Sequence, residues 1–319
     1  MKKRRKPKTP KFYVIGVDAG GTKTDVALAD LSGKILAIAR SGLASPRNLG
    51  IEESVFNIAN GIKEVLKKTK KGGRIVSTFV ALPAIEEEYK ERKAEILEML
   101  KARKGISKIL KGKISIGPDQ IASFRSGMNE KDGVLLIAGT GCVAHGWRAG
   151  KEHKASGWGY FSDEGSAFWV GQKVFQAILK DFDGRGPKTL LTPIVFKKFK
   201  LKTIDDFLQK IYSENHTIIF PKLSVICDQA SKKKDKVAKD IMVEAAKNLA
   251  FSAKQVIKNL KFQKIKFPIV LVGSMFKSKI ILKEICQEIK KTAPRARFIR
   301  PRKKAVLGAV KLAIEKIQE

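Results

Sequence analysis

The sequence predicts an α/β protein of two domains, each built on a central mixed sheet flanked by helices. Its 319 residues, 43% of them hydrophobic, suit one large domain or two ordinary ones with real cores. Apolar, strand-like runs alternate with amphipathic helical segments along the chain. A strand, a turn containing glycine and threonine, and a second strand occur twice, at residues 14–29 and 134–148. This repetition suggests that the two domains share one duplicated plan.

The N-terminal domain is expected over residues 12–129, after a basic tail at 1–11 that we expect to be disordered. Its strands are predicted at 14–17, 25–29, 34–39, 74–82 and 113–116, and its helices at 51–68, 86–104 and 120–128. In the helix at 51–68, Val55, Ile58 and Ile62 share one face. Asp119 follows the last strand directly, where it could cap the next helix.

The C-terminal domain is expected over residues 130–303. Its strands are predicted at 134–138, 142–148, 267–272 and 296–299, and its helices at 164–182, 204–212, 236–260 and 278–291. Thr203 is expected to cap the second of these helices. The closing segment, residues 304–319, holds a last helix that would pack back on the N-terminal domain.

The net charge of +34 attracts polyanions, but we favour a lysine-rich, solvated surface over a nucleic-acid interface. The lysines are spread along the chain, interleave poorly with aromatic residues, and accompany no known nucleic-acid-binding motif. A contact between the basic tail and nucleic acid is therefore not favoured, although the charge should attract ATP.

Because neither a membrane span nor a signal peptide is recognisable, we expect a cytoplasmic protein. The three cysteines are far apart, as is typical of reduced thiols.

The first turn has the chemistry of a phosphate and cation site. Gly20 and Gly21 let the backbone approach a ligand, and the hydroxyls of Thr22 and Thr24 could face a phosphate. Asp18, at the end of the strand, offers the oxygen ligand that Mg²⁺ prefers. The spacing matches neither a P-loop nor a dinucleotide fingerprint. The alternative is a hairpin whose glycines only make the turn tight.

Four motifs together carry a family resemblance. After VIGVDAGGTKTDVALA come LLIAGTGCVAHG, SGWGYFSDEGSAFWVG, and LVGSMF before a closing LGAVKLA helix. The first motif resembles the actin-like ATPase superfamily. The whole set resembles the BadF/BadG/BcrA/BcrD ATPase family, in its N-acetylglucosamine kinase-like branch. The resemblance implies a two-domain actin-like ATPase fold of the ribonuclease H-like type. It also implies that ATP and Mg²⁺ bind in the interdomain cleft, with an amino sugar opposite the γ-phosphate.

The same resemblance implies the roles of individual residues. ATP would contact Gly20, Gly21, Thr22, Lys23, Gly139, Thr140, Gly141, Gly273 and Ser274. The sugar would contact Asn48, Asp119, Gly157, Trp158 and Asp163. Asp119 would be the catalytic base, because a sugar hydroxyl needs a carboxylate to accept its proton as the bond to phosphorus forms. Asp18 would hold Mg²⁺.

Simpler roles stay open for several of these residues. Asp119 could be a helix cap only, and Asp163 could cap a helix that starts at Glu164. Trp158 could only pack, and Lys23 could be solvated. The chain also departs from the usual family motifs at Ala138, Cys142, Ser156 and Ser274.

The resulting expectation is an ATP-dependent kinase that phosphorylates a hydroxyl of N-acetylglucosamine or glucosamine. One alternative in the same family is an ATPase that activates a 2-hydroxyacyl-CoA dehydratase or benzoyl-CoA reductase, but it needs paired cysteines for an iron–sulfur cluster. The other is a non-catalytic sugar- or polyanion-binding protein on the same fold. The sequence leaves a homodimer open and does not name the sugar.

Overall fold

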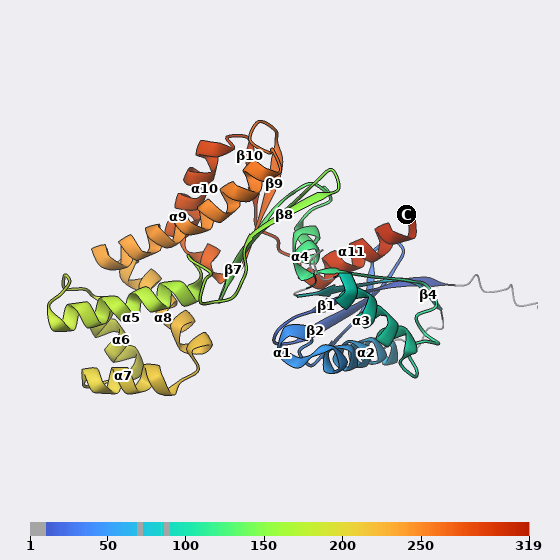
Figure 1. Ribbon diagram of the computed structural model, residues 1–319, viewed down its shortest axis with the longest axis horizontal. Helices are drawn as coiled ribbons and strands as arrows, with labels where there is room; N and C mark the ends of the chain where they lie inside the picture. The colour runs from blue at the N-terminus through green and yellow to red at the C-terminus, as the bar shows by residue number, and fades with distance from the viewer. Residues whose placement is uncertain (1–10, 69–72, 84, 86–89, 319) are drawn as a thin grey trace, which may run out of the picture. The chain divides into compact units, whose positions relative to one another are not determined.

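The computed structural model describes residues 11–68, 73–83, 85 and 90–318 (Figure 1). It divides into two compact units. Unit 1 consists of Met1–Glu130 together with Pro301–Glu319, and unit 2 consists of Lys131–Arg300. The predicted tail at residues 1–11 lies outside the described residues except for Lys11.

Unit 1 is built on a five-stranded sheet in the order β3-β2-β1-β4-β5. The strands are β1 (Phe12–Ala19), β2 (Thr24–Asp30), β3 (Ile35–Ser41), β4 (Arg74–Leu82) and β5 (Lys113–Pro118). The first three pair antiparallel, and β4 and β5 add parallel to β1. The carboxyl ends of β1, β4 and β5 therefore lie at one edge of the sheet, where ligands of α/β proteins commonly bind.

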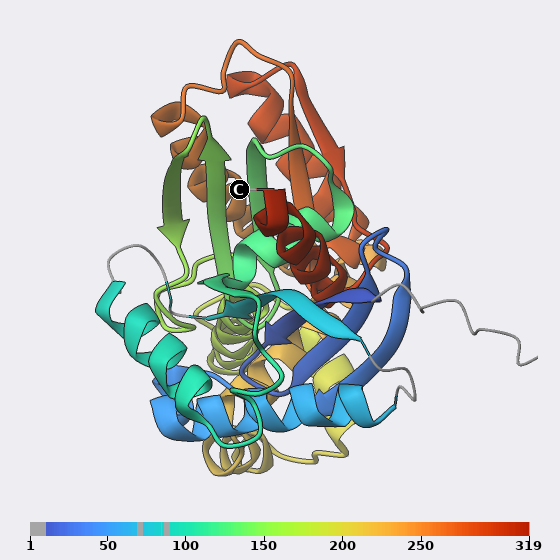
Figure 2. The same ribbon diagram turned by 90° about the vertical axis from the view of Figure 1, so that its right-hand side faces the viewer.

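Helices cover both faces of this sheet (Figure 2). One face packs on α2 (Ile51–Lys67) and α3 (Lys90–Ala102), and the other on α4 (Asp119–Gly127) and α11 (Ala305–Gln318). The short α1 (Pro46–Leu49) precedes α2. A Cβ atom at Gly308 of α11 would overlap the carbonyl oxygen of Ala122 in α4. Glycine at this position lets the two helices cross closely.

Unit 2 repeats the plan of unit 1. Its sheet has the order β10-β9-β6-β7-β8, made by β6 (Gly133–Ala138), β7 (Cys142–Arg148), β8 (Lys151–Ser156), β9 (Phe267–Val272) and β10 (Ala296–Ile299). Again the first three strands pair antiparallel, and two later strands add parallel to the first. The expectation of two mixed sheets that share one design is confirmed.

The helices of unit 2 share one large apolar core with its sheet. They are α5 (Ala167–Asp183), α6 (Leu191–Phe199), α7 (Ile204–Ser213), α8 (His216–Lys232), α9 (Lys236–Asn259) and α10 (Lys279–Thr292), with a 3-10 turn, η2 (Ser274–Lys277), after β9. Thr203 caps α7 through a capping box with Asp206, as predicted for Thr203.

Some predicted elements differ from the structure. The helix expected at 164–182 begins only at Ala167, because Gly165 adopts a positive φ of 85° that interrupts it. The helix expected at 86–104 is described from Lys90, and residues 86–89 lie outside the described part. The elements β8, α6 and α8 were not predicted. Within the described ranges, each helix is too short or too polar to cross a bilayer.

Candidate active site

The first glycine turn of unit 1 joins β1 to β2 and is tied to the segment just before α1, the short helix that carries Asn48. The amide of Gly20 donates to the carbonyl of Lys23 at 2.9 Å, and the amide of Ala44 donates to the carbonyl of Gly20 at 3.0 Å. A Cβ atom at Gly21 would lie 3.7 Å from Nδ2 of Asn48. Gly21 and Thr22 are exposed. The structure therefore brings the phosphate-turn candidates and Asn48 together.

One side chain of this turn, Lys23, has a charged partner inside the protein. Nζ of Lys23 lies 3.1 Å from Oδ2 of Asp25, and Nε of Arg40 donates to Oδ1 of Asp25 at 2.7 Å. The buried Asp25 thus holds Lys23 beside the turn, with the Lys23 side chain still half exposed. The expectation that the Thr24 hydroxyl faces a phosphate is wrong, because Thr24 lies completely buried within β2.

Asp18 has the electrostatics of a cation ligand. Burial, followed by repulsion from Asp25, raises the pKa of Asp18 from 3.8 to about 6, although Lys23 partly opposes the rise. Among the described residues we find no hydrogen-bond donor to this carboxylate, so its charge lacks a strong protein partner. A hard divalent cation would supply that partner, and carboxylate oxygen is the ligand that Mg²⁺ prefers.

Asp119 lies at the same edge of the sheet as Asp18. In the strand register Asp18 faces Ala81 and Ala81 faces Gly117, two residues before Asp119. With neighbouring strands about 4.8 Å apart, the backbone of Gly117 lies roughly 10 Å from that of Asp18 across the sheet. Asp119 is the first residue of α4, and the N-cap is Pro118. The alternative in which Asp119 is the helix cap is therefore wrong, and its carboxylate lies in the first turn, where the helix dipole favours negative charge.

The second glycine turn joins β6 to β7 and rests on the N-terminus of α5. The amide of Gly139 donates to the carbonyl of Gly141 at 2.9 Å. The amides of Ala167 and Phe168 donate to the carbonyls of Gly139 and Thr140 at 2.8 and 3.3 Å. These hydrogen bonds from the first residues of α5 fix the orientation of the turn. Thr140 remains exposed.

Gly273 and Ser274 lie beside this second turn. Gly273 follows β9, which pairs parallel with β6, so both strands end at the same edge. Gly273 has a φ of 120°, and a Cβ atom there would overlap the carbonyl oxygen of Ala138. Only glycine allows this approach. Ser274 is exposed and opens η2.

The candidate sugar loop of unit 2 is organised around Asp163. Oδ1 of Asp163 accepts from the amides of Gly157 and Trp158 at 3.0 and 3.1 Å. The helix cap at this position is Ser166, whose hydroxyl accepts from the amide of Trp169, so the alternative of Asp163 as N-cap is wrong. Trp158 is 62% exposed, with Nζ of Lys154 4.5 Å above its ring, which argues against a role in packing only.

Sequence reasoning missed several residues that support the site. Asp25 pairs with both Lys23 and Arg40, and the signal was a carboxylate at the start of the apolar run of β2. Cys142 and Ser156 contact Asp163, and they had been noted only as departures from the usual motifs. Burial raises the pKa of Cys142 to about 12, so this thiol is protonated at neutral pH.

The candidate metal ligand is a single carboxylate, Asp18. Over residues 11–68, 73–83, 85 and 90–318 no group of three or more His, Cys, Asp or Glu side chains is arranged to hold a metal ion. Mg²⁺ in phosphoryl-transfer sites commonly uses one or two carboxylates plus substrate phosphates and water, which Asp18 fits. Cys142 and Cys227 are buried thiols in unit 2.

Comparison with known proteins places the chain among sugar kinases. It is 29% identical over 305 residues to an N-acetylmuramic acid/N-acetylglucosamine kinase of Clostridium acetobutylicum, covering 94% of this chain and 98% of the relative. It is 29% identical over 321 residues to an N-acetyl-D-glucosamine kinase of Dictyostelium discoideum, covering 95% and 98%.

A solved structure from Chromobacterium violaceum, provisionally assigned as an N-acetylglucosamine kinase, superposes with a TM-score of 0.71. That match has 19% identity and covers 95% of this chain and 99% of the other. It confirms the expected fold, the actin-like ATPase fold of sugar kinases. The model of the BadF/BadG/BcrA/BcrD ATPase family matches residues 15–313. The chain therefore belongs to the BadF/BadG/BcrA/BcrD ATPase family.

Proposed function

We propose that this protein is an ATP-dependent kinase that transfers the γ-phosphate of ATP to a hydroxyl of an amino sugar, N-acetylglucosamine or glucosamine. The observation that carries the proposal is the pair of carboxylates at one sheet edge of unit 1, Asp18 next to a glycine turn and Asp119 at the start of α4. Phosphoryl transfer needs little more than positioning, charge neutralisation and a base for the attacking hydroxyl. The two kinases of known name that are 29% identical over nearly the whole chain support the same activity.

The roles divide among residues of both units. In unit 1, Gly20, Gly21, Thr22 and Lys23 would bind phosphate, and Asn48 would hold a sugar hydroxyl. Asp119 would accept the proton of the reacting hydroxyl. In unit 2, the proposed ATP contacts are Gly139, Thr140, Gly141, Gly273 and Ser274, and the proposed sugar loop contains Gly157, Trp158 and Asp163.

Asp18 is the residue we assign to Mg²⁺. Mg²⁺, when bound, would neutralise the charge of the phosphates. Burial destabilises the negative charge of the Asp18 carboxylate, as its raised pKa indicates, and a bound cation would offset that penalty. Lys23, held by Asp25, adds a second positive charge beside the turn.

A screen for ADP release tests the proposal across N-acetylglucosamine, glucosamine, N-acetylmuramic acid, glucose and mannose, each with MgATP. We expect release to depend on an amino sugar. ADP release without any sugar, together with iron-dependent absorbance, would favour the reductase-activator alternative. Absence of ADP release with every sugar would contradict the kinase and favour a binding protein.

A further inference from the structure

The carboxylate of Asp163 makes an unusual number of contacts to the backbone of its own unit. Oδ1 accepts from the amides of Gly157, Trp158 and Gly159 at 3.0, 3.1 and 3.4 Å, and from the Ser156 hydroxyl at 3.3 Å. Oδ2 accepts from the amide of Cys142 at 3.1 Å. The side chain is 4% exposed. Such a buried carboxylate is bound by successive amides in the way a nest binds an anion.

These donors come from two segments that are separate in the sequence. Cys142 is the first residue after the Gly139–Gly141 turn, which we assign to ATP, whereas residues 157–159 form the loop that we assign to the sugar. The Asp163 side chain spans the space between them. A Cβ atom at Gly141 would lie 2.7 Å from Oδ2, so the carboxylate fills the space that a side chain at residue 141 would need.

The loop depends on this anion for its conformation. Ser156 and Gly157 have positive φ values of 64° and 83°, which turn consecutive amides towards one point. Without an acceptor at that point, these part-buried amides would lose their protein partner, at a cost of up to about 1–3 kcal/mol each, the range for fully buried groups. The Cys142 thiol lies next to the start of the same loop, 3.5 Å from the Ser156 hydroxyl, and 3.3 Å from the carbonyl of Glu164.

We propose that Asp163 is a positioning residue whose carboxylate holds the Gly139–Gly141 turn and the 157–159 loop in one arrangement, so that the nucleotide and sugar contacts of unit 2 depend on each other. This role goes beyond a direct contact with a sugar hydroxyl, because the five protein donors already occupy most of the acceptor capacity of the carboxylate. The part of the inference that concerns substrates rests on the proposed kinase function. The coupling of the two segments does not.

The Cys142 thiol provides a readout that needs no substrate. Wild-type and Asp163→Asn proteins would be treated with iodoacetamide, and mass spectrometry would measure alkylation of Cys142 and Cys227 separately. Cys227 lies in the core of the same unit and reports global unfolding. We expect Cys142 to be alkylated about tenfold to a hundredfold faster in Asp163→Asn, with Cys227 unchanged, since loss of the anchor raises the population of the opened loop. Unchanged alkylation of Cys142 would overturn the proposal.

Two further variants make the result specific. Asp163→Asn also removes a negative charge near the Cys142 thiol, which could by itself change the rate of alkylation. Gly141→Ala keeps that charge but displaces the carboxylate. We therefore expect selective alkylation of Cys142 to rise in both variants. Asp183→Asn, which removes an exposed carboxylate at the end of α5, should leave Cys142 unchanged. Alkylation of Cys227 as well in both test variants would overturn the proposal, because the carboxylate would then stabilise the unit as a whole.

Kinetics with the preferred sugar separates positioning from direct binding. A positioning role predicts that Asp163→Asn raises the KM for ATP and the KM for the sugar, each about tenfold. A carboxylate that only binds the sugar predicts a change in the sugar KM alone, and that result would overturn the proposal. If the wild-type protein phosphorylates no sugar, the proposed function fails, and the alkylation experiment still decides the coupling.

Discussion

Asp18 combines a cost in stability with a role in binding. Because burial raises the pKa of Asp18 to about 6, its negative charge destabilises the folded state above pH 6, and this penalty disappears below about pH 4. We expect Asp18→Asn to stabilise the protein without Mg²⁺ at pH 7.5 by roughly 2–3 kcal/mol, and to have little effect at pH 4. Calorimetry at both pH values measures the difference.

The same variant tests the cation site. Added Mg²⁺ should raise the melting temperature of the wild type at pH 7.5, since a ligand that binds only the folded state stabilises it. It should raise that of Asp18→Asn much less. An equal rise in both proteins would show that Mg²⁺ binds elsewhere.

Asp119 is expected to act on the rate and not on nucleotide binding. We expect Asp119→Asn to bind ATP with unchanged affinity and to lower kcat by about 10²- to 10⁴-fold, the usual contribution of a general base. ADP release and calorimetric ATP titration measure the two quantities. The exposed carboxylate of Asp205 on α7 offers a control, because Asp205→Asn should not change kcat. A kcat for Asp119→Asn equal to that of the wild type would remove Asp119 as the base.

Among the elements, α11 completes unit 1 although it comes last in the chain. It packs on α4 and β1, and its Glu315 pairs with the buried Arg125 of α4. We expect Gly308→Ala to destabilise unit 1 by about 1–3 kcal/mol, because the added methyl overlaps the backbone of α4, which cannot move freely. Chemical denaturation measures the loss. Ile317→Ala, on the same helix but at an exposed position, should cost less than about 0.5 kcal/mol.

Elements with a strong apolar pattern were predictable, and those held by pairing or packing were not. The boundaries of β4 and β9 agree with the sequence pattern because largely buried runs rich in β-branched residues define them. The strand β8 is polar and is held by its ladder with β7, and α8 contains Pro221, which normally argues against a helix. The late start of α5 depends on Gly165, where a Cβ atom would lie 2.5 Å from the carbonyl of Ala245, a tertiary contact that no local pattern reveals.

The candidate site was predictable as motifs but not as a network. Asp18, Asp119 and both glycine turns could be predicted, because each follows directly after an apolar strand and is recognisable from a few neighbouring residues. The hydrogen bonds of Asp163 depend on how residues 156–159 turn towards Cys142, which only the folded unit defines.

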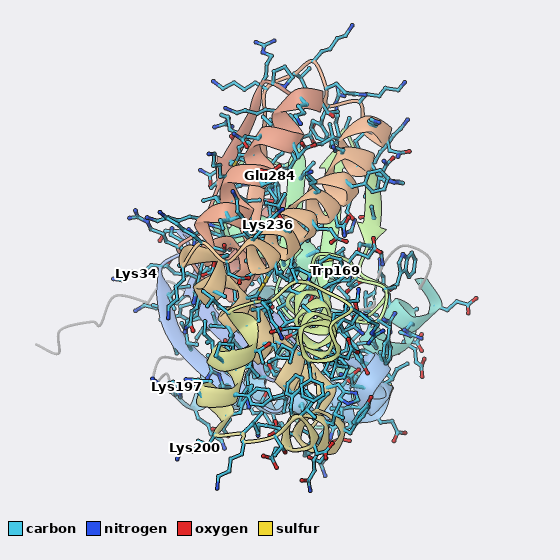
Figure 3. The ribbon with its side chains drawn as sticks, turned by 90° about the vertical axis from the view of Figure 1, so that its left-hand side faces the viewer. Lys34, Trp169, Lys197, Lys200, Lys236 and Glu284 are labelled. Atoms are coloured by element: carbon cyan, nitrogen blue, oxygen red, sulfur yellow. The ribbon has the colours of Figure 1, made fainter. Side chains whose placement is uncertain are left out.

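At the scale of the whole molecule, the net charge of +34 should affect encounters with ATP. Lysine side chains project from many helices of unit 2, including Lys197 and Lys200 at the end of α6 and Lys236 at the start of α9 (Figure 3). We expect kcat/KM for MgATP to fall about three- to tenfold as KCl rises from about 0.05 to 0.5 M, since salt screens long-range attraction. The kcat/KM for a neutral sugar, measured at saturating ATP, should change much less. An equal decrease for both substrates would contradict electrostatic attraction as the cause.

The position of α11 also matters during synthesis. The ribosome finishes β5 and α4 of unit 1 and then makes all of Lys131–Arg300 before it reaches Pro301–Glu319. At about 5–20 residues per second this interval lasts roughly 10–30 s. Throughout it, the nascent sheet lacks the helix that covers Val14, Ala27 and Phe79. A chaperone that binds apolar nascent chains therefore has a defined target in residues 12–130, and α11 has to be made before that target is covered.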